Sequence, residues 1–134
     1  MGRRRSSIYD DAIPDLGPAR EAALNPPGQW HIMISYSQQS DRAAMLSREL
    51  RSSLRETGLS VWFDVDMNDK SEAAMKEAVE HSRVVVAVVT GDGPRDEFAY
   101  LNRPFCQAEL RWAASAETYV QPVVHADDKN LPLQ

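Results

Sequence analysis

Cysteine is almost absent from this sequence, since Cys106 is the one cysteine among 134 residues. An internal disulfide needs two thiols, so a small secreted domain stapled by disulfides is excluded. A single thiol fits a reducing compartment, and we therefore expect the chain to be cytoplasmic.

Long hydrophobic runs are missing as well. The longest apolar run is Val84 to Val89, far short of the roughly 18 apolar residues that a membrane span needs. Arg3, Arg4 and Arg5 imitate the charged start of a secretory signal, but no apolar block follows them. We interpret them as part of a solvated tail and expect no membrane partner.

Positively charged residues are fewer than negatively charged ones. Fifteen Lys and Arg face 20 Asp and Glu, which gives a formal net charge of -5. Such a chain repels phosphate backbones, so we expect no nucleic-acid partner. The remaining composition, 43% hydrophobic and 26% charged, is that of one ordinary globular domain.

The first 28 residues differ from the rest of the chain. They contain Pro14, Pro18, Pro26 and Pro27 without a sustained hydrophobic period. This pattern is typical of a disordered tail or linker. We expect the folded domain to occupy residues 29–134.

Beyond that point, β-rich runs alternate with helical patterns. Strands are predicted at 31–36, 59–63, 84–89 and 119–124, and helices from a cap at Ser40 or Asp41 to about Thr57, after Ser71, and from Pro104 to about Glu117. In the first strand, Ile32, Ile34 and Tyr36 share one face and Met33 lies on the other. This alternation predicts an α/β fold with a flavodoxin-like, doubly wound parallel sheet. The continuously apolar run 84–89 is expected in mid-sheet.

Ligand sites of such sheets lie outside the carboxyl ends of the strands. Residues 35–37, Asp64, Thr90 and Gly91 are expected to surround that crevice. A long loop is predicted over 90–103. Only about ten residues follow the fourth strand, too few for another strand and helix, so we expect a sheet truncated before its last elements.

Glu109 is the anomaly of the helix that starts at Pro104. At about 100° per residue it falls on the face of Trp112, Ala113 and Cys106, while the opposite face remains available to it. Burying an unpaired carboxylate costs several kcal/mol, so Glu109 is a candidate active-site acid. The alternative is a carboxylate near a helix start that interacts with the helix dipole or belongs to a capping box.

Other residue groups suggest chemistry less strongly. Asp64, Asp66 and Asp69 resemble a cation site, but the loop lacks the glycine and closing glutamate of a calcium loop, which favours a solvated loop and no metal. Cys106 is a possible nucleophile at a helix start, although no histidine is placed to activate it, which favours a packed thiol. The acidic pair of a phosphoacceptor domain is missing after the first strand, where Ser37 and Gln38 stand.

Several segments of the sequence together resemble one known family. They are residues 32–37, 58–64 (Gly-Leu-Ser-Val-Trp-Phe-Asp), 71–89, 104–110 and 121–124. The family is that of TIR (Toll/interleukin-1 receptor) domains: residues 32–37 resemble its first box, and residues 58–64 resemble its second strand and the start of its BB loop. Residues 71–89 resemble the following helix and strand, 104–110 the aromatic-Cys-x-x-Glu-Leu motif, and 121–124 the fourth strand. The resemblance covers about Gln29 to Val124 in the family's order, and it implies a five-stranded sheet.

The resemblance also implies a function in intracellular signalling or immunity. Many TIR domains cleave the nicotinamide–ribose bond of NAD, and the glutamate of the motif, here Glu109, is their catalytic residue. NAD would then be a substrate, not a bound cofactor, yielding ADP-ribose or a cyclic form. The residues expected around the nucleotide are Tyr36, Ser37, Asp64, Thr90, Phe105 and Cys106.

Two departures from the family pattern bear on activity. Phe105 replaces the tryptophan before the cysteine, and the loop from Asp64 to Lys70 is short and without glycine. In enzymatic relatives this loop helps neighbouring copies to assemble, so self-association or pairing with other TIR domains is the partner expectation. The alternative function is a non-catalytic TIR adaptor that recruits other TIR domains.

Overall fold

In the part of the chain that the structure describes, four parallel strands form one sheet in the order β2-β1-β3-β4. They are β1 (Trp30–Tyr36), β2 (Val61–Trp62), β3 (Ser82–Val88) and β4 (Tyr119–Val123) in a computed structural model that describes residues 15–91 and 96–125. The mid-sheet position predicted for the apolar run is confirmed, because β3 lies between β1 and β4. The α/β fold with a parallel sheet is likewise as predicted.

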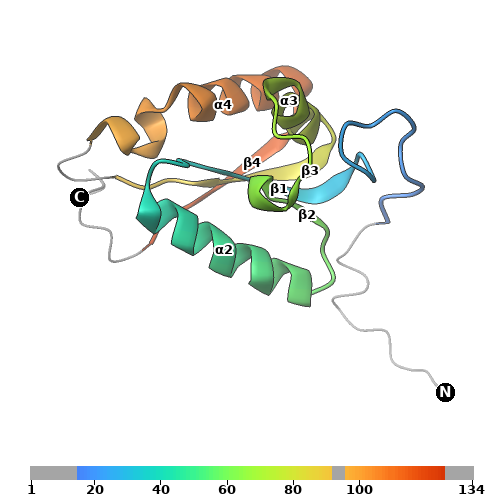
Figure 1. Cartoon of the computed structure of the whole chain (residues 1–134), viewed down its shortest axis with the longest axis horizontal. Helices are drawn as coiled ribbons and strands as arrows, with labels where there is room; N and C mark the ends of the chain where they lie inside the picture. The colour runs from blue at the N-terminus through green and yellow to red at the C-terminus, as the bar shows by residue number, and fades with distance from the viewer. Residues whose placement is uncertain (1–14, 92–95, 126–134) are drawn as a thin grey trace.

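Helices cover both faces of the sheet (Figure 1). The helix α2 (Asp41–Glu56) lies on one face, and α3 (Glu72–Glu80) and α4 (Pro104–Ala116) lie on the other. The helix starts follow the predicted local chemistry. Ser40 accepts a hydrogen bond from the backbone of Ala43 at 3.2 Å, and Ser71 accepts one from Ala74 at 3.2 Å.

The strand period of two separates the core into two layers. Ile32, Ile34 and Tyr36 pack toward α2, whose Leu46, Leu50 and Leu54 line the same layer. Met33 packs on the opposite side against residues of α3 and α4. The predicted division of β1 between the two faces is therefore confirmed, and it places the next residue of the Met33 side, Ser35, beneath α4.

Two elements differ from the sequence prediction. The second strand is reduced to the two residues that pair with β1, because the chain turns at once into a short 3-10 helix, η1 (Asp64–Asp66). The predicted loop 90–103 contains two further 3-10 turns, η2 (Asp96–Phe98) and η3 (Tyr100–Asn102). Local backbone hydrogen bonds, such as Asn102 N to Ala99 O at 3.0 Å, hold these turns. Turns this short have no hydrophobic period by which the sequence could predict them.

The described part of the predicted tail, residues 15–28, contacts the domain beside α3 (Figure 1). Asn25 is 2% exposed and pairs with the backbone of Asp69, donating to its oxygen at 2.8 Å and accepting from its nitrogen at 3.0 Å. Arg20 lies 3.5 Å from Glu77 of α3. These contacts extend the packed part of the chain before Gln29, where the sequence predicts folded structure to begin.

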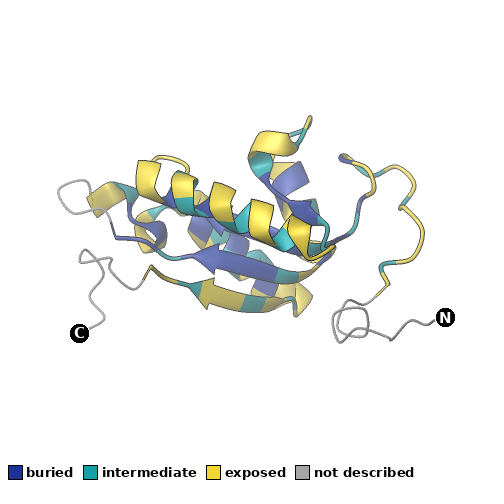
Figure 2. Cartoon of the chain, turned by 90° about the horizontal axis from the view of Figure 1, so that it is seen from below, coloured by how far each residue is buried: buried dark blue, intermediate teal, exposed yellow. Residues whose placement is uncertain are grey.

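Burial falls steeply across the sheet (Figure 2). The strand β1 is almost wholly buried, whereas β4 is mostly exposed. The predicted truncation concerns the chain after Val124, and most of that stretch, residues 126–134, lies outside the described residues.

Candidate functional site

Glu109 lies on the buried face of α4, as its helical position predicts. Its side chain is 5% exposed, between Cys106 at 2% and Ala113 at 0%. Pro104 stands in the first turn of α4, and the buried face of the helix meets the sheet at β1. The carboxylate therefore enters the interior directly above Ser35.

A short chain of hydrogen bonds ends on this carboxylate. Ser35 Oγ donates to Glu109 Oε1 at 2.6 Å, and the Tyr100 hydroxyl lies 2.7 Å from Ser35 Oγ. All three side chains are buried. Hydrogen bonds to an ionised group are about twice as strong as neutral ones, so Ser35 favours the carboxylate form of Glu109.

Burial acts in the opposite direction and is the stronger effect. Burial raises the pKa of Glu109, the Ser35 hydrogen bond lowers it, and the charge of Asp64 raises it; together these effects raise the pKa from an ordinary value of 4.5 to about 7. No ion pair to Glu109 is found among the described residues. The burial that the helical spacing predicts for Glu109 is thus observed, and it is accompanied by a raised pKa.

A small cleft of about 120 Å³ opens beside Glu109. It brings together five of the predicted site residues, namely Tyr36, Ser37, Phe105, Cys106 and Glu109. Gln38, Gln39, Met75 and Arg103 complete the lining. The cleft lies where the carboxyl end of β1 meets the start of α4, which is the crevice position expected for a parallel sheet.

The two remaining predicted residues lie outside the lining of the cleft. Asp64 accepts hydrogen bonds from the Tyr36 hydroxyl at 2.7 Å and from Gln38 at 2.8 Å, so it fixes two lining residues from behind. Burial, followed by Asp64, raises the pKa of Tyr36. Thr90 is 1% exposed, and its backbone oxygen accepts from Tyr100 at 2.9 Å. It therefore anchors Tyr100 and is not brought to the cleft.

The Cys106 thiol is enclosed and protonated. Burial, with a contribution from the neighbouring Glu109, raises its pKa to about 12. A thiolate nucleophile needs a lowered pKa. Cys106 consequently acts as a packed wall of the cleft.

The acidic residues after β2 are each engaged separately. Asp66 pairs with Arg51 at 2.7 Å and Arg55 at 3.0 Å, while the Asp69 carboxylate accepts from Ser71 N at 2.9 Å. Over residues 15–91 and 96–125, no group of three or more potential ligands is arranged to hold a metal ion.

Sequence reasoning missed the partners of Glu109. The sequence places Ser35 only at the rim of the crevice, and Tyr100 falls in the segment predicted as a loop. The sequence feature that could have indicated Ser35 as a partner of Glu109 is a hydroxyl side chain at a buried strand position, on the face of the sheet that α4 covers. Tyr100, 0% exposed, had no periodic context that could reveal its burial.

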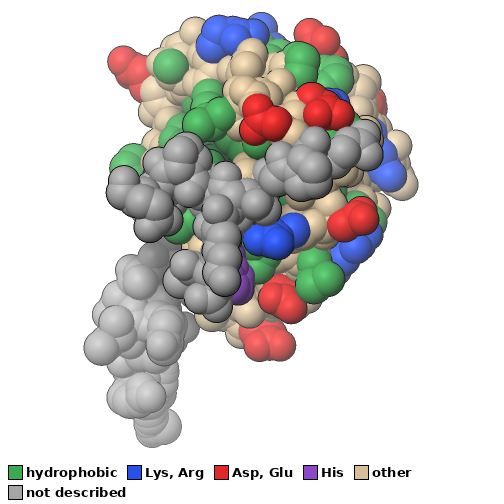
Figure 3. Space-filling model, turned by 90° about the vertical axis from the view of Figure 1, so that its left-hand side faces the viewer, with side chains coloured by type: hydrophobic (Ala, Val, Ile, Leu, Met, Phe, Trp, Pro, Cys, Tyr) green, Lys and Arg blue, Asp and Glu red, His purple; other side chains and the backbone are tan. Residues whose placement is uncertain are grey.

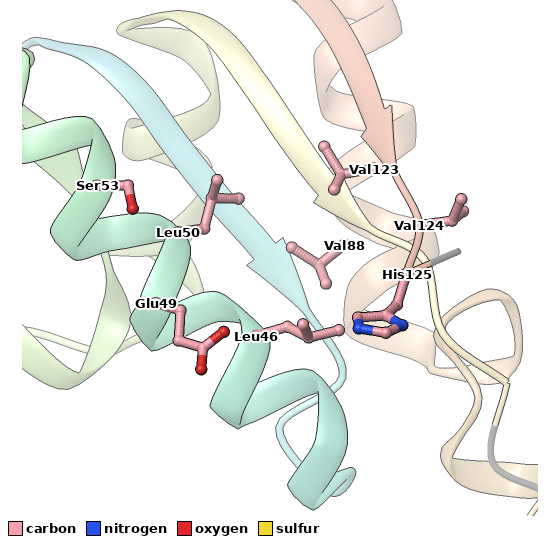
Figure 4. A pocket seen from close by; sticks show the side chains of 8 residues that line it. All are labelled: Leu46, Glu49, Leu50, Ser53, Val88, Val123, Val124 and His125. Atoms are coloured by element: carbon pink, nitrogen blue, oxygen red, sulfur yellow. The ribbon is translucent and has the colours of Figure 1, made fainter. Parts of the chain in front are cut away.

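A larger hollow lies elsewhere, between α2 and β4 (Figure 4). It measures about 260 Å³ and is mainly apolar, with Leu46 and Leu50 facing Val88 and Val123. No buried titratable group points into it among the described residues. The smaller cleft is the candidate site because it has the perturbed carboxylate.

Charges of both signs are interspersed on the face at the carboxyl ends of the strands (Figure 3).

None of the helices in the described part of the chain is long and apolar enough to cross a membrane.

The fold and site define a parallel α/β domain with a buried glutamate at its crevice. The family described as TIR domain matches residues 32–134. A crystal structure of the TIR domain of the Toll-related Receptor TRR-2 from Hydra magnipapillata is similar, with a TM-score of 0.55 and 17% identity over 78% of this chain and 77% of that chain. At that identity the likeness shows the fold alone. No curated protein matches.

The chain belongs to the TIR domain family, because the family match covers most of its length. It is accordingly a signalling domain of the TIR type.

Proposed function

We propose that the chain is an NAD glycohydrolase and that Glu109 is its catalytic residue. The observation that carries the proposal is the state of Glu109, which is 5% exposed, lines a cleft and has a pKa raised to about 7. A structural carboxylate gains nothing from such a position, since burial without a cationic partner costs stability. A catalytic role explains why a carboxylate that destabilises the fold occupies this position.

The chemistry follows from a negative charge beside the nicotinamide ribose. The bond between C1′ and the nicotinamide nitrogen breaks, and its electron pair leaves with neutral nicotinamide. Positive charge then develops on the ribose, where the Glu109 carboxylate stabilises it. Water adds to C1′ and loses a proton to give ADP-ribose, whereas an internal nucleophile gives a cyclic product.

The pKa of Glu109 sets the pH dependence of this reaction. With a pKa of about 7, about half of the molecules hold the carboxylate at neutral pH and most hold it at pH 8. Nicotinamide release should therefore rise between pH 6 and pH 8.

The size of the cleft supports a role for self-association. At about 120 Å³, it is smaller than the roughly 300–1,000 Å³ of typical ligand pockets. It has room for part of a dinucleotide. We propose that a neighbouring copy of the chain, or another TIR domain, completes the site around the rest of NAD.

Replacement of Glu109 by glutamine tests the proposal. Glu109→Gln keeps the shape of the side chain and the acceptor for Ser35 but loses the charge. We expect nicotinamide release at pH 7.5, measured by chromatography, to fall by about 100-fold or more. Glu56→Gln, an exposed change on α2, is the matched control and should behave as the parent. Equal release by Glu109→Gln and the parent would remove Glu109 from the mechanism.

A non-catalytic adaptor is the second candidate. Val65 supports it, because this apolar residue is 47% exposed at the turn after β2, where a protein partner could cover it. No nicotinamide release by the concentrated parent, together with binding to TIR domains that Val65→Asp abolishes, would favour the adaptor.

A further inference from the structure

The two oxygens of the Glu109 carboxylate have different surroundings. Oε1 accepts the Ser35 hydroxyl at 2.6 Å. No hydrogen-bond partner of Oε2 is found among the described residues. Oε2 is also absent from the fully buried side-chain atoms that lack a partner in this part of the chain, so it is not sealed from solvent. Since Glu109 lines the cleft, Oε2 is the oxygen that remains open to a ligand.

The donor at Oε1 is itself held from behind. A serine hydroxyl has one proton, and Ser35 gives it to Glu109. The contact of 2.7 Å with Tyr100 must therefore be a donation from the tyrosine. Tyr100 is fixed in turn by its backbone bond to Thr90 at 2.9 Å. Ser35 from β1 and Tyr100 from the loop that begins at Thr90 thus hold one carboxylate oxygen together.

We propose that Ser35, oriented by Tyr100, is the positioning residue of this site, and that it binds Oε1 so that Oε2 is presented to the substrate. Ser35 is 1% exposed and does not line the cleft, so it acts through Glu109 and touches no ligand. The substrate part of this inference rests on the proposed NAD-cleaving function. The hydrogen-bond chain does not depend on it.

The arrangement predicts how the titration of Glu109 responds to loss of the serine. The titratable or charged groups around Glu109 are Tyr36 from β1, Asp64 from η1, Tyr100 from η3, and Arg103 and Cys106 at the start of α4. Burial raises the pKa of Glu109, the Ser35 hydrogen bond lowers it, and the charge of Asp64 raises it. Removing that bond should raise this pKa further.

The expected shift follows from the strength of a hydrogen bond to a charged group, about 1.5–3 kcal/mol, which corresponds to about one to two pH units. The acid limb of the rate profile should move upward by that amount in Ser35→Ala. At pH 7 the carboxylate fraction, and with it kcat, should fall by at least about fivefold. KM should stay unchanged, because the serine makes no contact with the substrate.

The experiment compares pH profiles of nicotinamide release for the full chain and three variants. Ser35→Ala should show the full shift, and Tyr100→Phe, which keeps the ring and removes the hydroxyl, a smaller shift in the same direction. Ser47→Ala is the matched control, since Ser47 is a buried serine of α2 far from this chain of bonds. Acid limbs of Ser35→Ala and parent that coincide would overturn the proposal.

A second readout separates this inference from the proposed function. The carboxyl carbon of Glu109, assigned by its loss in Glu109→Gln, can be titrated by NMR without any turnover. A parent that releases no nicotinamide refutes the enzyme, but a higher midpoint in Ser35→Ala than in the parent still supports the positioning role. Equal midpoints refute it. If Ser35→Ala fails to fold because the Tyr100 hydroxyl is left unpaired, Tyr100→Phe decides alone.

Discussion

Glu109 combines a proposed chemical role with a cost to the fold. Its pKa is raised from an ordinary value of about 4.5 to about 7, so the folded chain holds a proton that the unfolded chain has released. Stability must then fall as pH rises from about 4.5 to about 7, and stay level above that range. The full cost at pH 8 is about 3 kcal/mol.

Glu109→Gln should therefore stabilise the chain at alkaline pH. Glutamine has no charge to bury, and its oxygen can still accept the Ser35 hydroxyl. Urea unfolding should show the variant to be more stable than the parent by about 2–3 kcal/mol at pH 8. Near pH 4.5 the two should have similar free energies of unfolding. A variant less stable than the parent at pH 8 would show that the carboxylate is not destabilising there.

At the scale of elements, the turn between β2 and α3 is fastened at three points. Asp64 holds two residues of the cleft, Asp66 is paired with two arginines of α2, and the backbone of Asp69 is held by Asn25. The exposed arginine pairs contribute about 0–1 kcal/mol. The buried amide of Asn25 is the stronger constraint, because its loss leaves two backbone groups without partners.

Asn25→Ala should lower the free energy of unfolding by about 1–3 kcal/mol. Amide hydrogen exchange should also become faster over residues 64–70, because the turn loses its attachment to the preceding segment. Asn68→Ala, an exposed change in the same turn, should stay within about 0.5 kcal/mol of the parent. If the two variants are equally stable, residues 15–28 do not hold the turn in solution.

The elements also show what sequence patterns can and cannot predict. The strand period placed Ile34 and Met33 on opposite faces, and the helical period placed Glu109 on the buried face, because both depend on spacing alone. Asn25 and Tyr100 could not be found in this way. Asn25 makes two hydrogen bonds to the backbone of Asp69, and the Tyr100 hydroxyl makes one to Ser35; such pairings across the fold leave no period in the sequence.

For the whole molecule, the small cleft and the net charge have opposite effects on self-association. A cleft of about 120 Å³ favours completion by a second copy, whereas copies that each carry a net charge of -5 repel one another. Salt screens such repulsion, with a Debye length of about 10 Å at 0.1 M. Assembly, and with it the proposed activity, should depend on concentration and ionic strength.

Nicotinamide release per chain should consequently rise with chain concentration, and should rise more at 0.15 M salt than at 0.01 M. Activity assays over a hundredfold dilution series, with the assembly state followed by light scattering, measure this. Release per chain that is constant over the whole series would show that one copy suffices.

The pH profile of nicotinamide release by the parent and by Glu109→Gln is the most direct measurement of whether the ionised Glu109 carboxylate promotes NAD cleavage. We expect a rate for the parent that rises through a midpoint near pH 7, following the pKa of about 7, and a rate for the variant near the blank at every pH. A variant that releases nicotinamide as fast as the parent would show that Glu109 is not the catalytic residue.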